Sequence, residues 1–234
     1  MKAITVPQPF AFEIMSGAKT IEVKDWDSAH RGDLLICSSR KPAFSKEEMD
    51  EMEDEYGCIF LYGQALCVVR LTDVRPMLKG DEEKALIDRI DPEAYSWIVE
   101  GPRLVVPFPV KSQTGLFEIE DRLITVSSFR YAEPVEVKKG IHAQDFGIDL
   151  SGWHGRASEI LVTQEGEPRV RVEWDSLSLS SIPLPVIERC EKEGFDWTGA
   201  LLRLNEIEHA APRDTWDDVQ DAIDSIMEDN PEIF

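Results

Sequence analysis

The sequence has few cysteines, and none of them is placed as in a metal or redox motif. Four of its 234 residues are cysteine: Cys37, Cys58, Cys67 and Cys190. It lacks a CxxC pair, and it lacks a nearby His-x-x-x-His pair that could complete a zinc site. We therefore expect the cysteines to be reduced and buried, and we expect neither a disulfide framework nor a zinc site.

Long hydrophobic runs are also missing. No stretch approaches the roughly 18 apolar residues of a membrane-spanning helix, and the segment from Met1 to Pro7 lacks the hydrophobic core of a signal peptide. We expect a soluble, cytoplasmic protein that has no membrane partner.

Basic residues are scarce. The chain has 25 Lys and Arg against 46 Asp and Glu, which gives a formal net charge of −21. Residues 1–126 carry 15 basic and 23 acidic side chains, and residues 127–234 carry 10 and 23. Because so acidic a surface repels a phosphate backbone, we expect no binding to duplex DNA.

One segment departs from this acidity. Within residues 19–41 five bases stand against four acids: Lys19, Lys24, Arg31, Arg40 and Lys41 against Glu22, Asp25, Asp27 and Asp33. Any anionic ligand would therefore have to bind in this segment.

The pattern of short strands with helices between them predicts an α+β fold. With 42% hydrophobic and 30% charged residues, the chain is of globular composition and long enough for one large or two small domains. In the first half strands are predicted over 3–6, 19–24, 33–37, 64–74, 95–99, 104–106 and 116–119, and helices over 9–16, 45–55 and 81–90. This arrangement favours a small β-barrel with flanking helices.

Local signals mark the ends of these helices. Gly17 and Gly57 are expected to end the first and second helices, and Ser45 with Glu48 forms a capping box at the start of the second. Gly101 and Pro102 are expected to separate two strands. In a strand over 19–24, Lys19 lies on one face and Glu22 on the other.

A polar stretch after Thr125 predicts a domain boundary, which gives domains 1–128 and 129–234. The second is expected to be a small acidic β-barrel with a C-terminal helix and a turn at 145–147. Thr215 and Asp218 form the cap of that helix. Its predicted buried stripe consists of Trp216, Val219, Ala222, Ile223, Ile226 and Met227.

Residues 1 to about 121 resemble the ASCH domain, which belongs to the PUA-like superfamily of small barrels. The run 4–11, which reads ITVPQPFA, and the run 17–22, which reads GAKTIE, are similar to the QPWA and GxKTxExR signatures of that family. Trp26 followed by RGDLLI at 31–36, YSWIVE at 95–100, PFPVK at 107–111 and GLF at 115–117 complete the pattern. Phe10 stands where Trp is frequent, and Lys24 stands where Arg is usual.

The resemblance implies a cleft that binds RNA or a modified nucleoside. Lys19 supplies a cation, Glu22 an acceptor for amino groups, and Gln8 an amide that can read a base edge. The other expected ligand-binding residues are Lys24, Trp26, Arg31, Trp97 and Lys111. Trp26 and Trp97 are candidates either for stacking on a base or for packing in the core.

The same resemblance implies a second possible function. Some small PUA-like relatives are amidohydrolases that remove the acetyl group of N4-acetylcytidine with a Lys, a Thr and a Glu. Lys19 stands at the position of their catalytic Lys, and Glu22 replaces their catalytic Thr. Lys19 and Glu22 are therefore the candidate catalytic residues for such a hydrolysis, with Glu22 as a general base.

Residues 133 to about 229 resemble the CcbP family of cyanobacterial calcium-binding proteins. The resemblance rests on GIDLSGWHGR at 147–156, VEWDS at 172–176, CEKEGFDW at 190–197 and PRDT at 212–215. It implies a Ca²⁺ site among clustered carboxylates, for which the candidates are Asp214, Asp217, Asp218 and Asp221. The alternative to a Ca²⁺ site is a solvated acidic helix face. If the site binds Ca²⁺, a third possible function of the chain is that of a calcium-binding protein in which the first domain is accessory.

Overall fold

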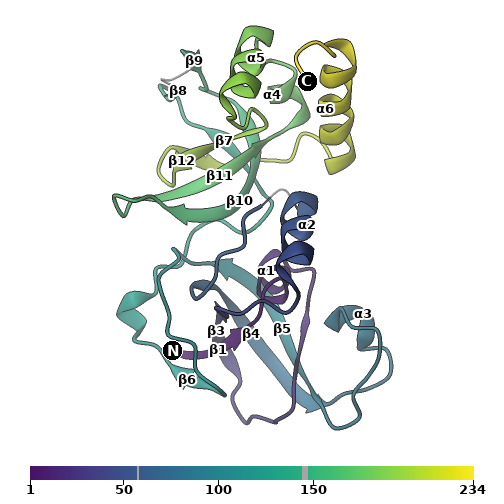
Figure 1. Ribbon diagram of the computed structural model, residues 1–234. Coiled ribbons are helices and arrows are strands. Elements are labelled where there is room, and N and C mark those ends of the chain that lie inside the picture. The colour runs from purple at the N-terminus through teal and green to yellow at the C-terminus, as the bar shows by residue number, and fades with distance from the viewer. Residues whose placement is uncertain (57, 144–146) are drawn as a thin grey trace. The chain divides into compact units, whose positions relative to one another are not determined.

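The computed structural model describes residues 1–56, 58–143 and 147–234, which form two compact units, Met1–Tyr131 and Ala132–Phe234 (Figure 1). This division lies close to the boundary predicted after residue 128. Gly57 and most of the predicted turn at 145–147 lie outside the described residues. Over the described chain, no helix is both long enough and apolar enough to cross a membrane.

The first unit is built on a six-stranded sheet that curls into a half-barrel (Figure 1). Its strands lie in the order β2 (Ile21–Lys24), β5 (Tyr95–Leu104), β4 (Ala65–Pro76), β3 (Gly32–Ser38), β1 (Lys2–Val6) and β6 (Phe117–Glu118). β1 and β3 are parallel, and the other neighbouring strands are antiparallel. The helices are α1 (Phe10–Ser16), α2 (Lys46–Tyr56), α3 (Glu82–Ala85) and the short 3₁₀ helix η1 (Asp121–Leu123).

The mixed α+β class is confirmed, and the barrel is corrected to an open half-barrel with β2 and β6 as its outer strands in the part of the chain described. The turn predicted at Gly101 and Pro102 is wrong, because β5 continues through both residues. Gly101 takes a φ of 59°, and the pairing of β4 with β5 shifts register between Val68 and Arg70, so the strand bends there without ending.

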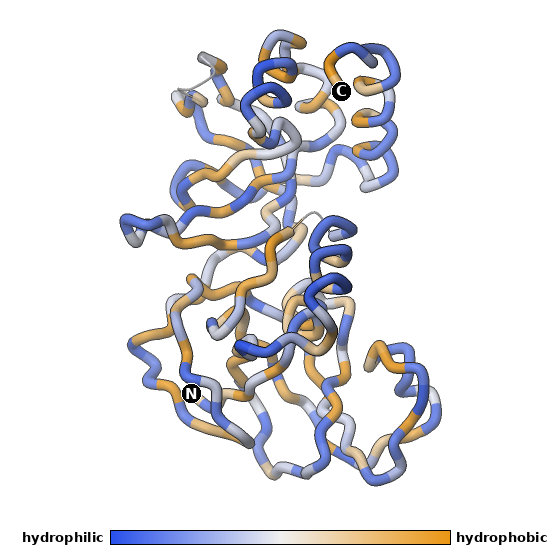
Figure 2. Tube along the Cα trace, in the orientation of Figure 1, coloured by the Kyte–Doolittle hydropathy of each residue, from blue (hydrophilic) through white to orange (hydrophobic). Residues whose placement is uncertain are grey.

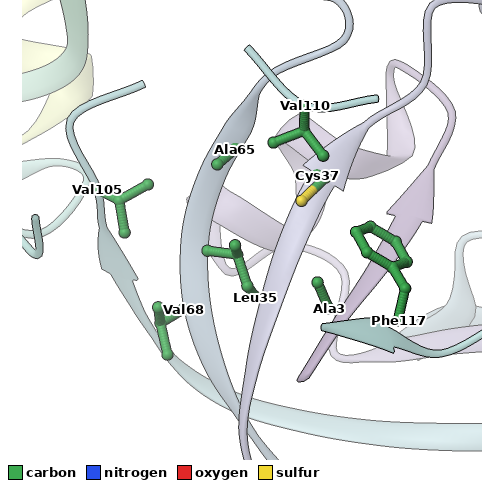
Figure 3. Close-up of a cluster of buried hydrophobic side chains, with 8 residues drawn as sticks. All are labelled: Ala3, Leu35, Cys37, Ala65, Val68, Val105, Val110 and Phe117. Carbon is green, nitrogen blue, oxygen red and sulfur yellow. The ribbon is translucent and has the colours of Figure 1, made fainter. Parts of the chain in front are cut away.

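Hydrophobic side chains from β1, β3, β4 and the segments after β5 fill one face of the curled sheet (Figure 3). They belong to Ala3, Leu35, Cys37, Ala65, Val68, Val105, Val110 and Phe117, all of them buried. α2 contrasts with this core, because Met49 is its buried residue and most of its trace is hydrophilic (Figure 2).

The second unit contains a five-stranded antiparallel sheet in the order β12 (Gly199–Arg203), β11 (Pro168–Trp174), β10 (His154–Val162), β7 (Glu133–Val137) and β13 (Ile207–His209). A separate two-stranded ribbon pairs β8 (His142–Ala143) with β9 (Ile148–Asp149). The helices are α4 (Ser176–Leu179), α5 (Leu184–Glu193) and α6 (Trp216–Asp229). Within the described residues β12 and β13 are the outer strands of the sheet, so the closed barrel predicted for this unit is not seen.

The start of α6 is confirmed, because Thr215 and Asp218 form the reciprocal capping box. The buried stripe predicted for this helix is partly wrong. Val219 is buried, whereas Trp216 is 47% exposed and Met227 is 41% exposed.

Candidate functional site

The turn between β1 and α1 is held by the side chain of Gln8. The Gln8–Pro9 peptide bond is cis, and the Gln8 side chain is buried. Its Nε2 donates to the carbonyl of Leu61 at 3.0 Å, and its Oε1 accepts the amide of Phe12 at 2.9 Å. The side-chain amide of Gln8, which was predicted to read a base edge, is therefore already hydrogen-bonded within the protein. Contact with a base would require these hydrogen bonds to break.

Lys19 and Glu22 lie together and are buried, with 3% and 5% of their surfaces exposed. Lys19 Nζ is 3.7 Å from Glu22 Oε2, and Lys24 Nζ is 2.8 Å from Glu22 Oε1. We call Lys19, Glu22 and Lys24 the charged cluster. One carboxylate thus neutralises two ammonium groups in a largely water-excluded place.

The prediction that Lys19 and Glu22 lie on opposite faces of a strand is wrong. β2 begins only at Ile21, and Lys19 stands before it, where its amide donates to the carbonyl of Glu13 at 2.9 Å. Gly17, with a φ of 89°, ends α1 in the left-handed conformation and turns the chain into this position. Because Lys19 is outside the strand, the alternation of a strand does not apply to it.

The ammonium group of Lys19 has two further neighbours. It donates to the carbonyl of Ala85, and it lies over the ring of Phe10, 5.1 Å from the ring centre. Burial lowers the pKa of Lys19 below that of an ordinary lysine, and the charge of Glu22 opposes that shift. Lys19 therefore gives up its proton more readily than an exposed lysine.

Sequence reasoning missed Glu13, a second buried carboxylate beside the cluster. Glu13 lies on α1, accepts a hydrogen bond from the Tyr56 hydroxyl, and favours the charged form of Lys19. Its position inside the apolar run FAFEIMS is the signal that could have identified it.

The two tryptophans pack against each other. Trp97 is 0% exposed, and its Nε1 donates to the carbonyl of Trp26 at 3.2 Å. The rings meet edge to face, with centres 4.5 Å apart. The sequence left both stacking on a base and packing in the core open. Trp97 packs in the core, and its faces are closed to a ligand in this structure. Trp26 is half-buried.

Arg31 and Lys111 are not among the contacts of the charged cluster. Arg31 donates to Asp73 at 3.0 Å and to the carbonyls of Ser28 and His30, each at 2.8 Å. Lys111 is exposed and follows Val110, whose amide donates to the carbonyl of Gly63 at 2.8 Å.

The structure does not bring the four predicted calcium ligands together. Asp214 accepts from Arg156 Nη2 and from the amide of Ser176, both at 2.6 Å, and Asp218 is used in the cap of α6. Asp217 and Asp221 are exposed. In the described segments no group of three or more His, Cys, Asp or Glu side chains is arranged to hold a metal ion. Calcium binding therefore stays a prediction from the sequence.

Comparison with known proteins identifies the first unit. Residues 4–112 match the model of the ASCH domain, so the N-terminal region of this chain contains an ASCH domain. The likeness of residues 133–229 to the CcbP family lies outside this match and stays a prediction.

Two curated relatives match about half of this chain. Activating signal cointegrator 1 of Homo sapiens and that of Mus musculus are each 24% identical over 131 residues, which is 51% of this chain. The matched region spans only 22% of the length of those relatives.

Two solved structures are also similar. ASCH from Zymomonas mobilis is 11% identical with a TM-score of 0.39, over 52% of this chain and 88% of that one. A mutant of the same protein is 12% identical with a TM-score of 0.33, over 51% of this chain and 90% of that one.

Proposed function

We propose that the ASCH domain of this chain binds RNA or a nucleoside at the charged cluster. The supporting observation is the burial of Lys19 with Glu22 beside the ring of Phe10. Removing a charged group from water costs several kcal/mol per ion, which is comparable to the net free energy of folding of a whole domain. Titratable groups buried at such a cost cluster at functional sites, which supports a ligand-binding role for this one.

The chemistry of the cluster suits a nucleobase. Glu22 is an acceptor for an exocyclic amino group, and the two lysines are donors for base carbonyl or phosphate oxygens. Phe10 offers an aromatic ring for stacking. Binding of this kind replaces the bonds that the cluster makes within itself by bonds to the ligand.

Calorimetric titration of cytidine and N4-acetylcytidine into the full chain tests this proposal. We expect saturable binding to the wild type and an affinity at least about tenfold weaker for Lys19→Met, which corresponds to the roughly 1.4 kcal/mol of one charge-assisted hydrogen bond. Lys79→Met, at an exposed lysine, is the control and should bind as the wild type does. Equal affinity of Lys19→Met and wild type contradicts the proposal.

We propose the amidohydrolase as a second candidate, supported by the lowered pKa of Lys19. A less protonated amine is better suited to accept a proton from a water molecule as that water attacks the acetyl carbon; the amide C–N bond then breaks and releases acetate and cytidine. The purified protein should then release acetate from N4-acetylcytidine, and Lys19→Met should abolish the release. Acetate at the level of the uncatalysed reaction removes this candidate and leaves the binding proposal intact.

A further inference from the structure

The second unit has a small cavity that lies apart from the ASCH domain. Its volume is about 10 Å³, roughly the space of one water molecule. Three sequence runs that are far apart along the chain, GIDLSGWHGR, VEWDS and PRDT, meet at its wall. The charged and titratable side chains that they contribute belong to His154, Arg156, Asp175, Arg213 and Asp214.

Two ion pairs form much of the cavity wall. Arg156 Nη2 donates to Asp214 Oδ1 at 2.6 Å and to the carbonyl of Asp214 at 2.7 Å. Arg213 donates to Asp175 through Nε at 2.7 Å and through Nη2 at 2.8 Å. Each carboxylate also accepts a backbone amide at the start of α4. Both guanidinium groups are therefore held in place by the fold.

Arg156 keeps a donor that the fold does not use. Its surface is only 6% exposed, and within the described chain its buried Nη1 has no hydrogen-bond partner. The ring of Trp216 covers the guanidinium group, with the ring centre 4.7 Å from Cζ. Exposed cations such as Lys79 and Arg89 are hydrated by bulk water, whereas a buried charged donor needs a specific acceptor.

The charges around the cavity restrict that acceptor. A guanidinium group binds carboxylate and phosphate oxygens most strongly. Burial raises the pKa of Asp175 and of Asp214, but the hydrogen bonds that each accepts outweigh burial and hold both pKa values below the ordinary value of an aspartate. Two ionised carboxylates repel a dianion twice as strongly as a monoanion at the same distance. A carboxylate is therefore favoured over a phosphate.

The rest of the wall indicates what the carboxylate is attached to. The side chain of Arg213 is 33% exposed, and its three hydrogen bonds within the described residues use Nε and Nη2, so Nη1 remains for a second ligand oxygen. The cavity has room for one oxygen atom, and the neighbouring apolar residues Pro134, Ala211 and Pro212 lie beside it. A short aliphatic group suits this apolar surface.

We propose that this cavity binds a monocarboxylate with an aliphatic substituent, with one oxygen accepting from Arg156 Nη1 and the other from Arg213. A free short-chain carboxylic acid and the carboxyl terminus of a peptide share this chemistry. The proposal concerns the second unit alone, so it does not depend on ligand binding at the charged cluster of the first unit.

Nuclear magnetic resonance of the ¹⁵N-labelled full chain tests the proposal with propionate as the probe. Because the amide of Ser176 donates to Asp214, its signal should shift as the cavity fills. We expect saturable binding with a dissociation constant on the order of 1 mM. Inorganic phosphate at equal ionic strength should bind at least about tenfold more weakly.

A peptide distinguishes the two sources of the carboxylate. Acetyl-trialanine with a free carboxyl terminus is compared with its carboxyl-terminal amide. Tighter binding of the free peptide than of propionate assigns the cavity to a peptide terminus, and tighter binding of propionate assigns it to a small acid. In both cases the amide should not bind, and equal binding of amide and acid contradicts the proposal.

Two variants locate the binding. Ala211→Leu places a larger side chain at the cavity and leaves both ion pairs in place, so it should weaken propionate binding at least about tenfold. Ser225→Leu, at an exposed position of α6, is the matched control and should bind as the wild type does. Arg156→Lys keeps the charge beside Asp214, removes the planar fork, and should weaken binding to a similar extent. If Arg156→Lys does not fold, Ala211→Leu decides.

Other results overturn the proposal. Shifts that do not saturate, phosphate binding as tight as that of propionate, or wild-type affinity in Ala211→Leu would each show that the cavity does not bind a carboxylate. A crystal structure grown with propionate that shows only an ordered water molecule on Arg156 Nη1 would assign that donor to the fold.

Discussion

Glu22 is the residue on which the charged cluster depends. Its carboxylate is within 3.7 Å of Lys19 Nζ and 2.8 Å of Lys24 Nζ, and its side chain is 7% exposed. A buried carboxylate that neutralises two ammonium groups leaves both of them uncompensated when it is removed. Removing Lys19 is different, because Glu22 remains paired with Lys24.

This asymmetry gives a prediction about stability. We expect Glu22→Gln to lower the free energy of unfolding by about 3 kcal/mol, because it leaves buried cations without a counterion. Lys19→Met keeps most of the apolar stem and removes a buried charge, so it should change stability by less than about 1 kcal/mol. Urea unfolding measures both values.

The stability of Lys19→Met decides how a defect in binding is interpreted. If Lys19→Met were as destabilising as Glu22→Gln, Lys19 would be needed for folding, and a defect in binding could not be assigned to ligand contact. The proposal requires Lys19→Met to be folded and defective in binding.

Burial also predicts the reactivity of the cysteines. It raises the pKa of the Cys37 thiol to about 12 and raises that of Cys67 as well, and Cys190 is also buried. Because the thiolate is the reactive form, we expect Cys58, which is only partly buried, to react first with a thiol reagent at pH 8. The absorbance of released thionitrobenzoate should show one fast thiol in native protein and four in denaturant; more than one fast native thiol contradicts the described burial.

At the scale of elements, the cap of α6 is the clearest local determinant of structure. Thr215 Oγ1 accepts the amide of Asp218 at 3.3 Å, and Asp218 Oδ2 accepts the amide of Thr215 at 2.8 Å. Thr215→Ala should cost about 1 kcal/mol of stability, whereas Thr215→Ser keeps the acceptor and should cost less than half of that. Thermal unfolding followed by circular dichroism measures both, and equal losses for the two variants would show that the hydroxyl does not stabilise the helix.

Element boundaries with a local chemical cause could be predicted from the sequence. The caps at Ser45 and Thr215 and the end of α1 at Gly17 depend on residues within one helical turn, and the structure confirms them. β5 could not be predicted in full, because its passage through Gly101 depends on pairing with β4, which is distant in sequence. The half-exposed Trp216 has a similar cause, since its ring lies 4.7 Å from the guanidinium of Arg156 on another element.

The candidate site was predicted only in part for the same reason. The motif brought attention to Lys19 and Glu22, but their direct contact depends on Lys19 standing before β2. The tertiary partners of Gln8 and Trp97 occupy the groups that the sequence offered to a ligand. Residue types can be read from a sequence, whereas the bonds already made by each side chain require the fold.

At the scale of the whole molecule, charge restricts which nucleic acid can bind. The net charge of −21 opposes any phosphate backbone, so a nucleic acid must gain free energy from base contacts and stacking at the charged cluster in order to bind. A duplex keeps its bases stacked within the helix and offers them less readily to Phe10.

We therefore expect a fluorescein-labelled single-stranded RNA to bind at least about tenfold more weakly when it is annealed to its complementary strand, since base stacking on an aromatic ring contributes about 1–3 kcal/mol per base. Anisotropy at one fixed salt concentration measures both forms. Equal affinity for strand and duplex would show that binding depends on charge alone.

The charged cluster as the ligand site is the central claim, and a crystal structure of the full chain soaked with cytidine tests it most directly. We predict density for the base within hydrogen-bond distance of the Glu22 carboxylate, with Lys19 Nζ moved from the carbonyl of Ala85 toward the ligand. Cytidine bound at a different place, with Glu22 still enclosed between Lys19 and Lys24, would contradict the account.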